Sequence, residues 1–290
     1  MSRSLKHCAC VVALSALLVA CVFLPLLPGR YDPLAMTLSA IAQALGVAGM
    51  LLLPLNAAWL IHEVRRRRAR DERAAPVRDW GHGFALAALA AWVLIAAFVS
   101  FGAFAMSGPS LVAVVLALSF CGLSGLARRL ESLKHVPERP LSLVPLYLLV
   151  VPVAVTGARF LFLAPAVDNS RNRAIRNSAE LIAEIEAYHA ERGHYPLSLA
   201  ALHKDYDTGV IGIEQYEYEP RGDAYSVFFE QLAVPVGTRE IVMYNKLGEH
   251  ALPSHDSDIL RWTPAQLAAR PGHYAIHDAT SPHWKYFWFD

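Results

Sequence analysis

Five long apolar stretches constrain the fold of this chain more than any other feature of its sequence. They cover residues 8–27, 34–61, 83–106, 110–127 and 141–163, and polar connectors separate them. An α-helix needs about 20 apolar residues to cross the hydrocarbon core of a bilayer. The sequence therefore predicts a membrane domain over residues 1–165, built as an α-helical bundle of five transmembrane helices.

The connectors between these stretches alternate in charge. Two cationic residues precede the first stretch, seven Arg follow the second, and four Lys or Arg follow the fourth. The connectors after the first and third stretches together hold a single Arg. Cationic connectors stay in the cytoplasm by the positive-inside rule. We therefore expect a multi-pass protein of the bacterial inner membrane, with a cytoplasmic N-terminus and with residues 166–290 in the periplasm.

The first apolar stretch has more than one interpretation. A basic start followed by an apolar core is typical of a cleaved signal peptide, and LVAC at 18–21 resembles a bacterial lipobox with Cys21 as the lipidated residue. However, the apolar run continues beyond Cys21 as VFLPLL, where a mature lipoprotein usually turns polar. We therefore interpret the stretch as an uncleaved anchor.

Few strongly polar side chains occur inside the apolar stretches. Gln43 and Asn56 lie within the second stretch and predict hydrogen bonds between helices. Arg159 lies near the outer end of the fifth, where its side chain is expected to extend toward the lipid headgroups. The Arg run at 65–68 either binds anionic headgroups or fixes topology, and we favour the second interpretation.

Residues 166–290 have a different composition. They carry 18 Asp and Glu against 11 Lys and Arg, whereas residues 1–165 carry 7 against 15. The basic residues of the first part lie in short connectors between apolar runs, which argues against a nucleic-acid-binding arm. All four Cys lie in the first part, so the second part has no disulfide and depends on its own apolar core.

The second part begins with a helical pattern. Gly193 and Pro196 are expected to end this helix. Its buried face is formed by residues at spacings of three and four: Ala174, Ser178, Leu181, Ile185 and Tyr188.

The pattern then changes to the alternation of β-strands. PRGD at 220–223 separates two alternating segments and predicts a hairpin turn. Thr263 and Pro264 predict the start of a short helix. Strands are expected at 211–219, 224–232, 238–245, 273–278 and 283–290. Residues 166–290 therefore predict an α+β domain, with a long helix packed on an antiparallel sheet.

One segment carries a family resemblance. An apolar span that runs into an amphipathic helix and then into YHAERGHYPLSLAAL, at 188–202, resembles the type IV pilins and type II secretion pseudopilins. In that family the helix ends at a Gly-x-Tyr-Pro stretch, followed by a Leu-rich turn and an antiparallel sheet. LGEHALPSHDSDILRW at 247–262 is similar to the calcium loop of the major pseudopilins. The resemblance covers 145–290 loosely and 175–202 best, and it implies a pilin-like fold.

The chain also departs from that family. Pilins have one span, a short leader that is cleaved after Gly, and a Glu near the new N-terminus. Here four further apolar stretches precede the fifth, which holds Pro145 and Pro152 and no acidic residue. The resemblance therefore implies a fixed sensing or docking module rather than a polymerising subunit.

Metal sites are considered at two places. Asp256 and Asp258 can supply hard oxygen ligands to Ca²⁺, but Asp-rich loops are also commonly plain turns. Several His in the last 50 residues suggest zinc. His273 and His277 share a strand face but would lie about 13 Å apart, so we favour scattered surface histidines. We therefore expect no cofactor, with calcium at Asp256 and Asp258 as the alternative.

The C-terminal HWKYFWFD is unusually aromatic. On a strand Trp284, Tyr286 and Trp288 lie on one face, and Phe287 and Phe289 lie on the other. Core packing explains this pattern, and a strip that faces a partner or the membrane surface is the alternative.

Motifs for hydrolysis or phosphate binding do not occur in the sequence, including Gly-x-Ser-x-Gly and His-Glu-x-x-His. We therefore expect an interaction or scaffold protein that presents a periplasmic domain. Its expected partners are the lipid bilayer and an envelope or secretion protein, and not nucleic acid. The alternatives are a membrane enzyme, and a small-solute or lipid-handling protein regulated by its periplasmic part.

Overall fold

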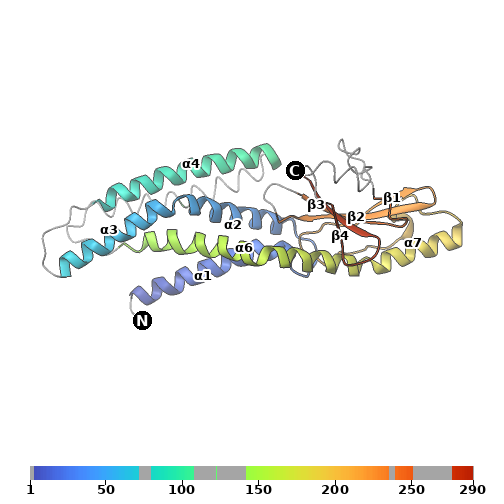
Figure 1. Cartoon of the computed structure of the whole chain (residues 1–290), viewed down its shortest axis with the longest axis horizontal. Coiled ribbons are helices and arrows are strands. Elements are labelled where there is room, and N and C mark those ends of the chain that lie inside the picture. Colours follow the sequence, from blue (N-terminus) through green and yellow to red (C-terminus); the bar gives the residue numbers. More distant parts are fainter. Residues whose placement is uncertain are drawn as a thin grey trace. The chain divides into compact units, whose positions relative to one another are not determined.

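The structure of the chain is a computed structural model that describes residues 3–71, 80–107, 122, 142–234, 239–250 and 276–289. The chain divides into two compact units (Figure 1). Unit 1 comprises Met1–Val22 and Thr37–Leu161, and unit 2, which we call the head, comprises Phe23–Met36 and Phe162–Asp290. The head thus includes the connector between the first two apolar stretches, which the sequence had assigned to the membrane part.

Unit 1 is helical. Three helices of the described chain are long and apolar enough to cross a membrane, with candidate spans at Leu5–Leu26, Pro33–Leu51 and within Val144–Arg192. Gly81–Ala97 is a shorter apolar helix, and the stretch expected at 110–127 lies outside the described residues apart from residue 122. The described helices of unit 1 are α1 (Arg3–Phe23), α2 (Pro33–Leu51), α3 (Leu53–Asp71), α4 (Gly81–Ser107) and the first part of α6 (Val144–Asn177). The described chain therefore supports a membrane protein with three candidate spans.

The second apolar stretch differs from the continuous helix expected at 34–61. α2 ends at Leu51 and α3 begins at Leu53, with the Leu52 N–H donating to the Gly49 carbonyl at 3.1 Å. Pro54 lies in the first turn of α3, where its missing N–H costs no helical hydrogen bond. Proline therefore explains why the helix restarts here.

Polar side chains link three helices of unit 1. Arg159 donates through Nε to Oε1 of Gln43 at 2.7 Å, so this part of its guanidinium contacts α2 rather than extending to the headgroups as expected. Gln43 donates to the Ser39 hydroxyl at 3.1 Å, and Ser39 donates to the Val22 carbonyl at 2.7 Å. The interhelical role predicted for Gln43 is therefore confirmed.

The helical part of the head consists of the end of α6 and α7 (Ala179–Arg192). The sequence predicted one helix here, but a turn at Ser178 separates α6 from α7. The Ser178 hydroxyl donates to the Ile175 carbonyl at 2.7 Å, a local bond that competes with regular helix. Gly193 ends α7 as expected, with a left-handed φ of 77° and an N–H bonded to the His189 carbonyl.

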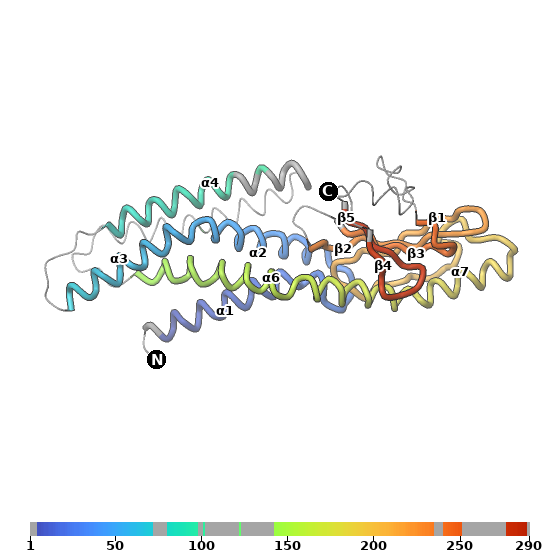
Figure 2. The backbone as a smooth tube through the Cα atoms, in the orientation of Figure 1, coloured from blue at the N-terminus to red at the C-terminus, as the bar shows by residue number. Residues whose placement is uncertain are grey.

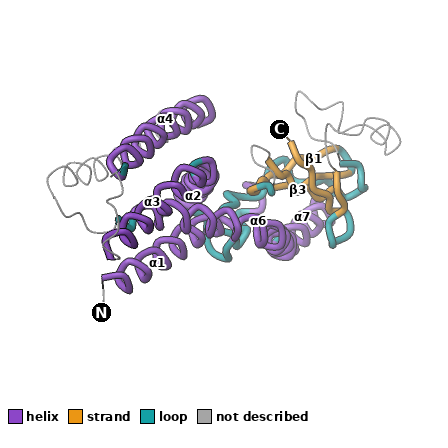
Figure 3. Tube along the Cα trace, turned by 60° about the vertical axis from the view of Figure 1, so that its left-hand side comes forward, coloured by secondary structure: helices purple, strands orange, loops and turns teal. Residues whose placement is uncertain are grey.

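The strands of the head form one antiparallel sheet (Figure 3). Their order in the sheet is β1-β2-β3-β5-β4, so the last strand lies between β3 and β4. Figure 2 traces these strands in the orange to red part of the backbone tube. The β1–β2 hairpin turns at Gly222, whose φ is 58°, which confirms the predicted turn. The strands are β1 (Glu217–Arg221), β2 (Ala224–Leu232), β3 (Arg239–Asn245), β4 (Ile276–Asp278) and β5 (Trp284–Phe289). The short helix expected at Thr263 lies outside the described residues.

The core of the head joins helix and sheet. Leu181 and Ile185 of α7 are fully buried, as are Tyr225 and Phe229 of β2. Each such apolar side chain contributes about 1.5–3 kcal/mol by leaving water. The short helical turn η2 (Leu199–Leu202) packs its leucines on this core. The long helix on an antiparallel sheet that the sequence predicted is therefore present.

Candidate functional site

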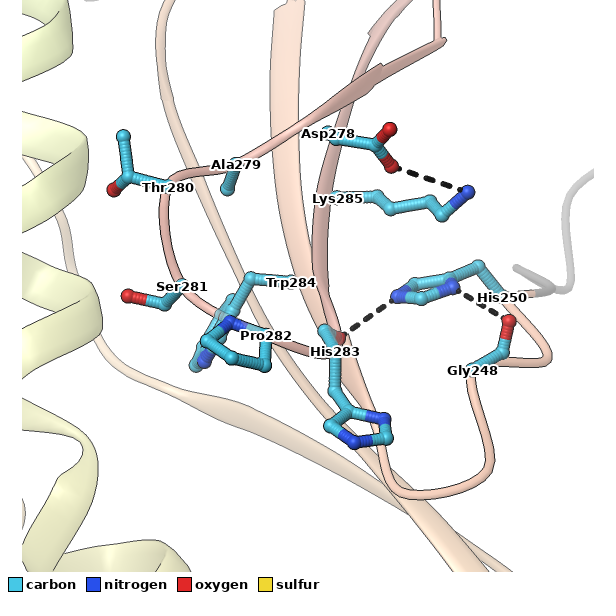
Figure 4. A pocket seen from close by; sticks show the side chains of 10 residues that line it. All are labelled: Gly248, His250, Asp278, Ala279, Thr280, Ser281, Pro282, His283, Trp284 and Lys285. Carbon is cyan, nitrogen blue, oxygen red and sulfur yellow. Dashed lines mark hydrogen bonds and ion pairs between the residues drawn. The ribbon is translucent and has the colours of Figure 1, made fainter.

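A pocket of about 410 Å³ opens on the head between two turns (Figure 4). Gly248 and His250 line it from the turn after β3, and residues 278–285 line it from the connection between β4 and β5. Two short hydrogen-bonded turns position these groups, because the Gly248 N–H donates to the Asn245 carbonyl at 3.1 Å and the Trp284 N–H donates to the Ser281 carbonyl at 3.3 Å. The lining thus combines small side chains with two imidazoles and the charged groups of Asp278 and Lys285.

His250 connects the two turns. Its Nδ1 lies 3.1 Å from the Gly248 carbonyl oxygen, and its Nε2 lies 3.0 Å from the His283 carbonyl oxygen (Figure 4). Carbonyl oxygens only accept, so both hydrogen bonds form together only when the imidazole is protonated. Burial nevertheless lowers the pKa of His250, and the nearby charge of Lys285 lowers it further, against the two carbonyls that raise it. Acid therefore changes the way in which His250 holds the pocket.

The rim of the pocket carries one ion pair and one strained residue. Lys285 Nζ lies 3.3 Å from Asp278, whose side chain is 85% exposed. Water screens such a pair, so it adds little stability and leaves both groups accessible. His283 has a φ of 65°, which is uncommon for a residue with a side chain and indicates a turn held by its surroundings. The rim therefore presents one charge of each sign.

The aromatic side chains of β5 divide between core and margin. Trp284 is 5% exposed and packs in the head core. Tyr286 carries the Arg171 guanidinium 3.6 Å above its ring, and Trp288 donates through Nε1 to Glu240 at 2.8 Å. Trp284 thus has the position that core packing requires, while Tyr286 and Trp288 are half-buried and line the edge of a polar network.

That polar network was not predicted from the sequence. Arg171 of α6 donates to both carboxylate oxygens of Glu240 on β3, at 2.7 and 3.0 Å, and also to Asp168 at 2.7 Å. Glu240 is fully buried, and Gln231 and Trp288 donate to the same carboxylate. Because these charged groups satisfy one another, the network joins α6 to the sheet and contributes no free acid or base to the pocket.

A second network explains the Gly-His-Tyr-Pro stretch. Tyr195 is buried, and its ring stacks on His189 with centroids 4.2 Å apart. Lys246 bonds to the Tyr195 hydroxyl and, at 2.9 Å, to Glu186, and these contacts raise the pKa of Lys246. Tyr225 also donates to Glu186, at 2.9 Å. The stretch therefore fixes the end of α7 against the sheet, which is a structural role.

The metal hypotheses remain predictions. Asp256, Asp258 and His273 lie outside the described residues. Among the described residues, no group of three or more His, Cys, Asp or Glu is arranged to hold a metal ion. His277 is described, and its ring stacks on Tyr286 with centroids 4.8 Å apart and lies 4.6 Å from the Trp288 ring centroid. Its ring therefore contacts aromatic side chains of β5.

Comparison of the chain with protein-family models, with curated proteins and with solved structures finds no match. The resemblance to pilins thus remains a hypothesis carried by residues 188–202. In the structure this segment comprises the end of α7, the left-handed Gly193, the buried Tyr195 and the turn η2, followed by an antiparallel sheet.

Proposed function

We propose that this chain is an integral protein of the bacterial inner membrane that presents a periplasmic, pilin-like head as a docking or scaffold domain for an envelope or secretion protein. The pocket between the turn after β3 and the β4–β5 connection carries the proposal. Its small side chains, imidazoles and ion-paired rim supply the hydrogen-bonding and charged groups found at the polar rim of a protein interface.

The proposed topology has five transmembrane helices, a cytoplasmic N-terminus and a periplasmic head. Alternating connector charge supports it. The head supports it independently, because Phe23–Met36 and Phe162–Asp290 belong to one compact unit. Both segments must then lie on the same side of the membrane, so an even number of crossings separates them. Five helices, with four crossings between the two segments, satisfy this condition.

The pilin-like character of the head is proposed from its order of elements. An apolar helix continues into α7, a left-handed Gly ends α7, and a Leu-rich turn leads to the sheet. Because further apolar helices precede α6 in the same chain, we propose a fixed docking module and not a pilus subunit.

Site-directed photo-crosslinking in intact cells tests the proposed function. A photoreactive amino acid replaces Pro282, an exposed residue of the pocket, and in a matched variant it replaces Glu191, an exposed residue of α7. We expect the Pro282 variant to crosslink reproducibly to one envelope protein, and the Glu191 variant to give less of that product. Equal crosslinking at the two positions, or catalytic turnover by the purified protein, would contradict the docking role.

Topology needs a separate measurement. Protease added to the outside of intact spheroplasts is expected to cut the head and to leave the Arg-rich segment at 65–73 intact. Cleavage of that segment in intact spheroplasts, with protection of the head, would reverse the proposed orientation.

A further inference from the structure

The connector between α1 and α2 forms backbone hydrogen bonds with a distant segment of the head. Pro28 and Val210 form an antiparallel bridge. The Gly29 N–H donates to the Gly209 carbonyl at 3.1 Å, and the Ile211 N–H donates to the Leu27 carbonyl at 3.0 Å. The Gly212 N–H donates to the Pro25 carbonyl at 2.7 Å and extends the pairing at one end, and the Asp32 N–H donates to the Ile211 carbonyl at 3.0 Å. The connector therefore pairs along residues 209–212 as a short strand would.

Apolar packing accompanies this pairing. Leu26 of the connector is 7% exposed and belongs to one buried cluster with Leu163 and Val167 of α6. Val210, opposite Pro28, is fully buried in the main core of the head. The connector thus covers apolar side chains of the head that would otherwise meet water.

Two glycines allow the close approach. A Cβ on Gly212 would lie 2.7 Å from the Pro25 carbonyl oxygen and 2.5 Å from the Pro25 Cβ. A Cβ on Gly29 would lie 2.8 Å from Ile211 Cγ1. Gly209 has a φ of 70°, in the left-handed region that favours glycine. Both segments therefore have glycine where the contact requires it, which indicates a specific contact.

We propose that Phe23–Met36 is a strap that completes the head, so that the head reaches its stable folded state only when the strap lies along residues 209–212. The strap is covalently continuous with α1 on one side and with α2 on the other. Folding of the head is therefore coupled to insertion of the first helical hairpin, because a hairpin inserted with its connector on the wrong side removes the strap. The device makes a stable head conditional on correct membrane insertion.

Disulfide trapping tests the contact in the full chain. Residues 28 and 210 form the non-hydrogen-bonded type of antiparallel pair, in which the Cα atoms approach most closely. Cys8, Cys10, Cys21 and Cys121 are first replaced by Ser, and a protease site is inserted after Asp71. We expect oxidised Pro28→Cys/Val210→Cys to hold the two fragments together after cleavage, and Pro28→Cys/Glu191→Cys to release them. Equal release by both pairs would overturn the proposal.

A steric variant tests whether the head needs the strap. Gly212→Ala drives a Cβ into the Pro25 backbone, whereas Gly157→Ala adds a Cβ that meets nothing within 4 Å. We expect protease to cut the head of Gly212→Ala about tenfold faster than wild type, and that of Gly157→Ala at the wild-type rate. Oxidised Pro28→Cys/Val210→Cys should restore resistance to Gly212→Ala by holding the strap in place. Wild-type resistance of Gly212→Ala would show that the head is stable without the strap.

Discussion

The side-chain amide of Asn56 donates to the carbonyl oxygen of Leu148 at 3.2 Å, and this bond replaces a backbone hydrogen bond that α6 cannot form. Pro152 lies four residues after Leu148 and has no N–H, so the Leu148 carbonyl cannot accept the usual helical hydrogen bond from that position. Asn56 is fully buried, and within the described chain its Oδ1 accepts no hydrogen bond. The amide is therefore positioned for Leu148, as expected where a proline interrupts a membrane helix.

Replacement of Asn56 by Leu should lower the stability of the helical part by about 1 kcal/mol, the size usual for hydrogen bonds between membrane helices. The same substitution in a Pro152→Ala background should cost less, because an alanine N–H can bond to the Leu148 carbonyl. Unfolding of the full chain in detergent, followed by circular dichroism for the four members of this cycle, measures the difference. Equal costs in the two backgrounds would show that Asn56 does not act through Leu148.

The Arg171–Glu240 pair predicts a larger effect in the head. Glu240→Ala leaves the 7% exposed guanidinium of Arg171 without its buried partner, and we expect a loss of about 3–5 kcal/mol. Arg171→Met/Glu240→Leu removes both charges and should cost less than the sum of the two single changes. Denaturant unfolding of the full chain, followed by tryptophan fluorescence, gives both values. Glu191→Ala, on the exposed face of α7, is the control and should change stability by no more than about 0.5 kcal/mol. An additive double variant would show that the two charges stabilise the head independently.

The elements that follow local chemistry could be predicted from the sequence. Gly193 ends a helix because its left-handed conformation suits glycine, and this requirement is visible in one residue. The hairpin around Gly222 and the interhelical role of Gln43 follow in the same way from residue type and position. Periodicity likewise indicated the helix face that holds Leu181 and Ile185.

The contacts that depend on distant segments could not be predicted. The pairing of Pro28 with Val210 joins two short loops with no alternating pattern, and nothing local to either loop indicates the other. Arg171 and Glu240 are charged residues that single-sequence patterns assign to a solvated face, yet their mutual bonds allow burial. The pocket at His250 likewise arises because β5 brings its preceding turn beside the turn after β3.

The hypothesis that Asp256 and Asp258 bind calcium predicts a stability effect by mass action, because a ligand that binds only the folded state stabilises it. We expect the melting temperature of the head to rise with about 1 mM Ca²⁺ and to fall with a chelator. Asp256→Asn/Asp258→Asn should remove both responses. If a chelator left the melting temperature of the wild type unchanged, the calcium hypothesis for this segment would be wrong.

The pocket predicts a pH dependence that originates at His250. Burial holds the pKa of His250 below its ordinary value of 6.5, so near neutral pH and just below it the unfolded chain binds the proton more readily than the folded chain. The contribution of His250 to stability is therefore fully present above pH 6.5 and is lost as the pH falls through the folded-state value. We expect the stability of the head to decline as the pH falls below about 6.5, and His250→Gln to weaken this decline.

The control for this experiment is His194→Gln, which replaces an exposed histidine beyond the end of α7. It should leave the acid-dependent decline of the wild type in place, because His194 is not one of the residues that line the pocket. Thermal unfolding across this pH range measures all three proteins. If the stability of His250→Gln declined with falling pH as steeply as that of the wild type, the acid sensitivity would arise elsewhere in the head. Since His250 bonds to the carbonyls of Gly248 and His283, crosslinking at Pro282 should also change over the same pH range. That agreement would link the state of this imidazole to the shape that the pocket presents to a partner.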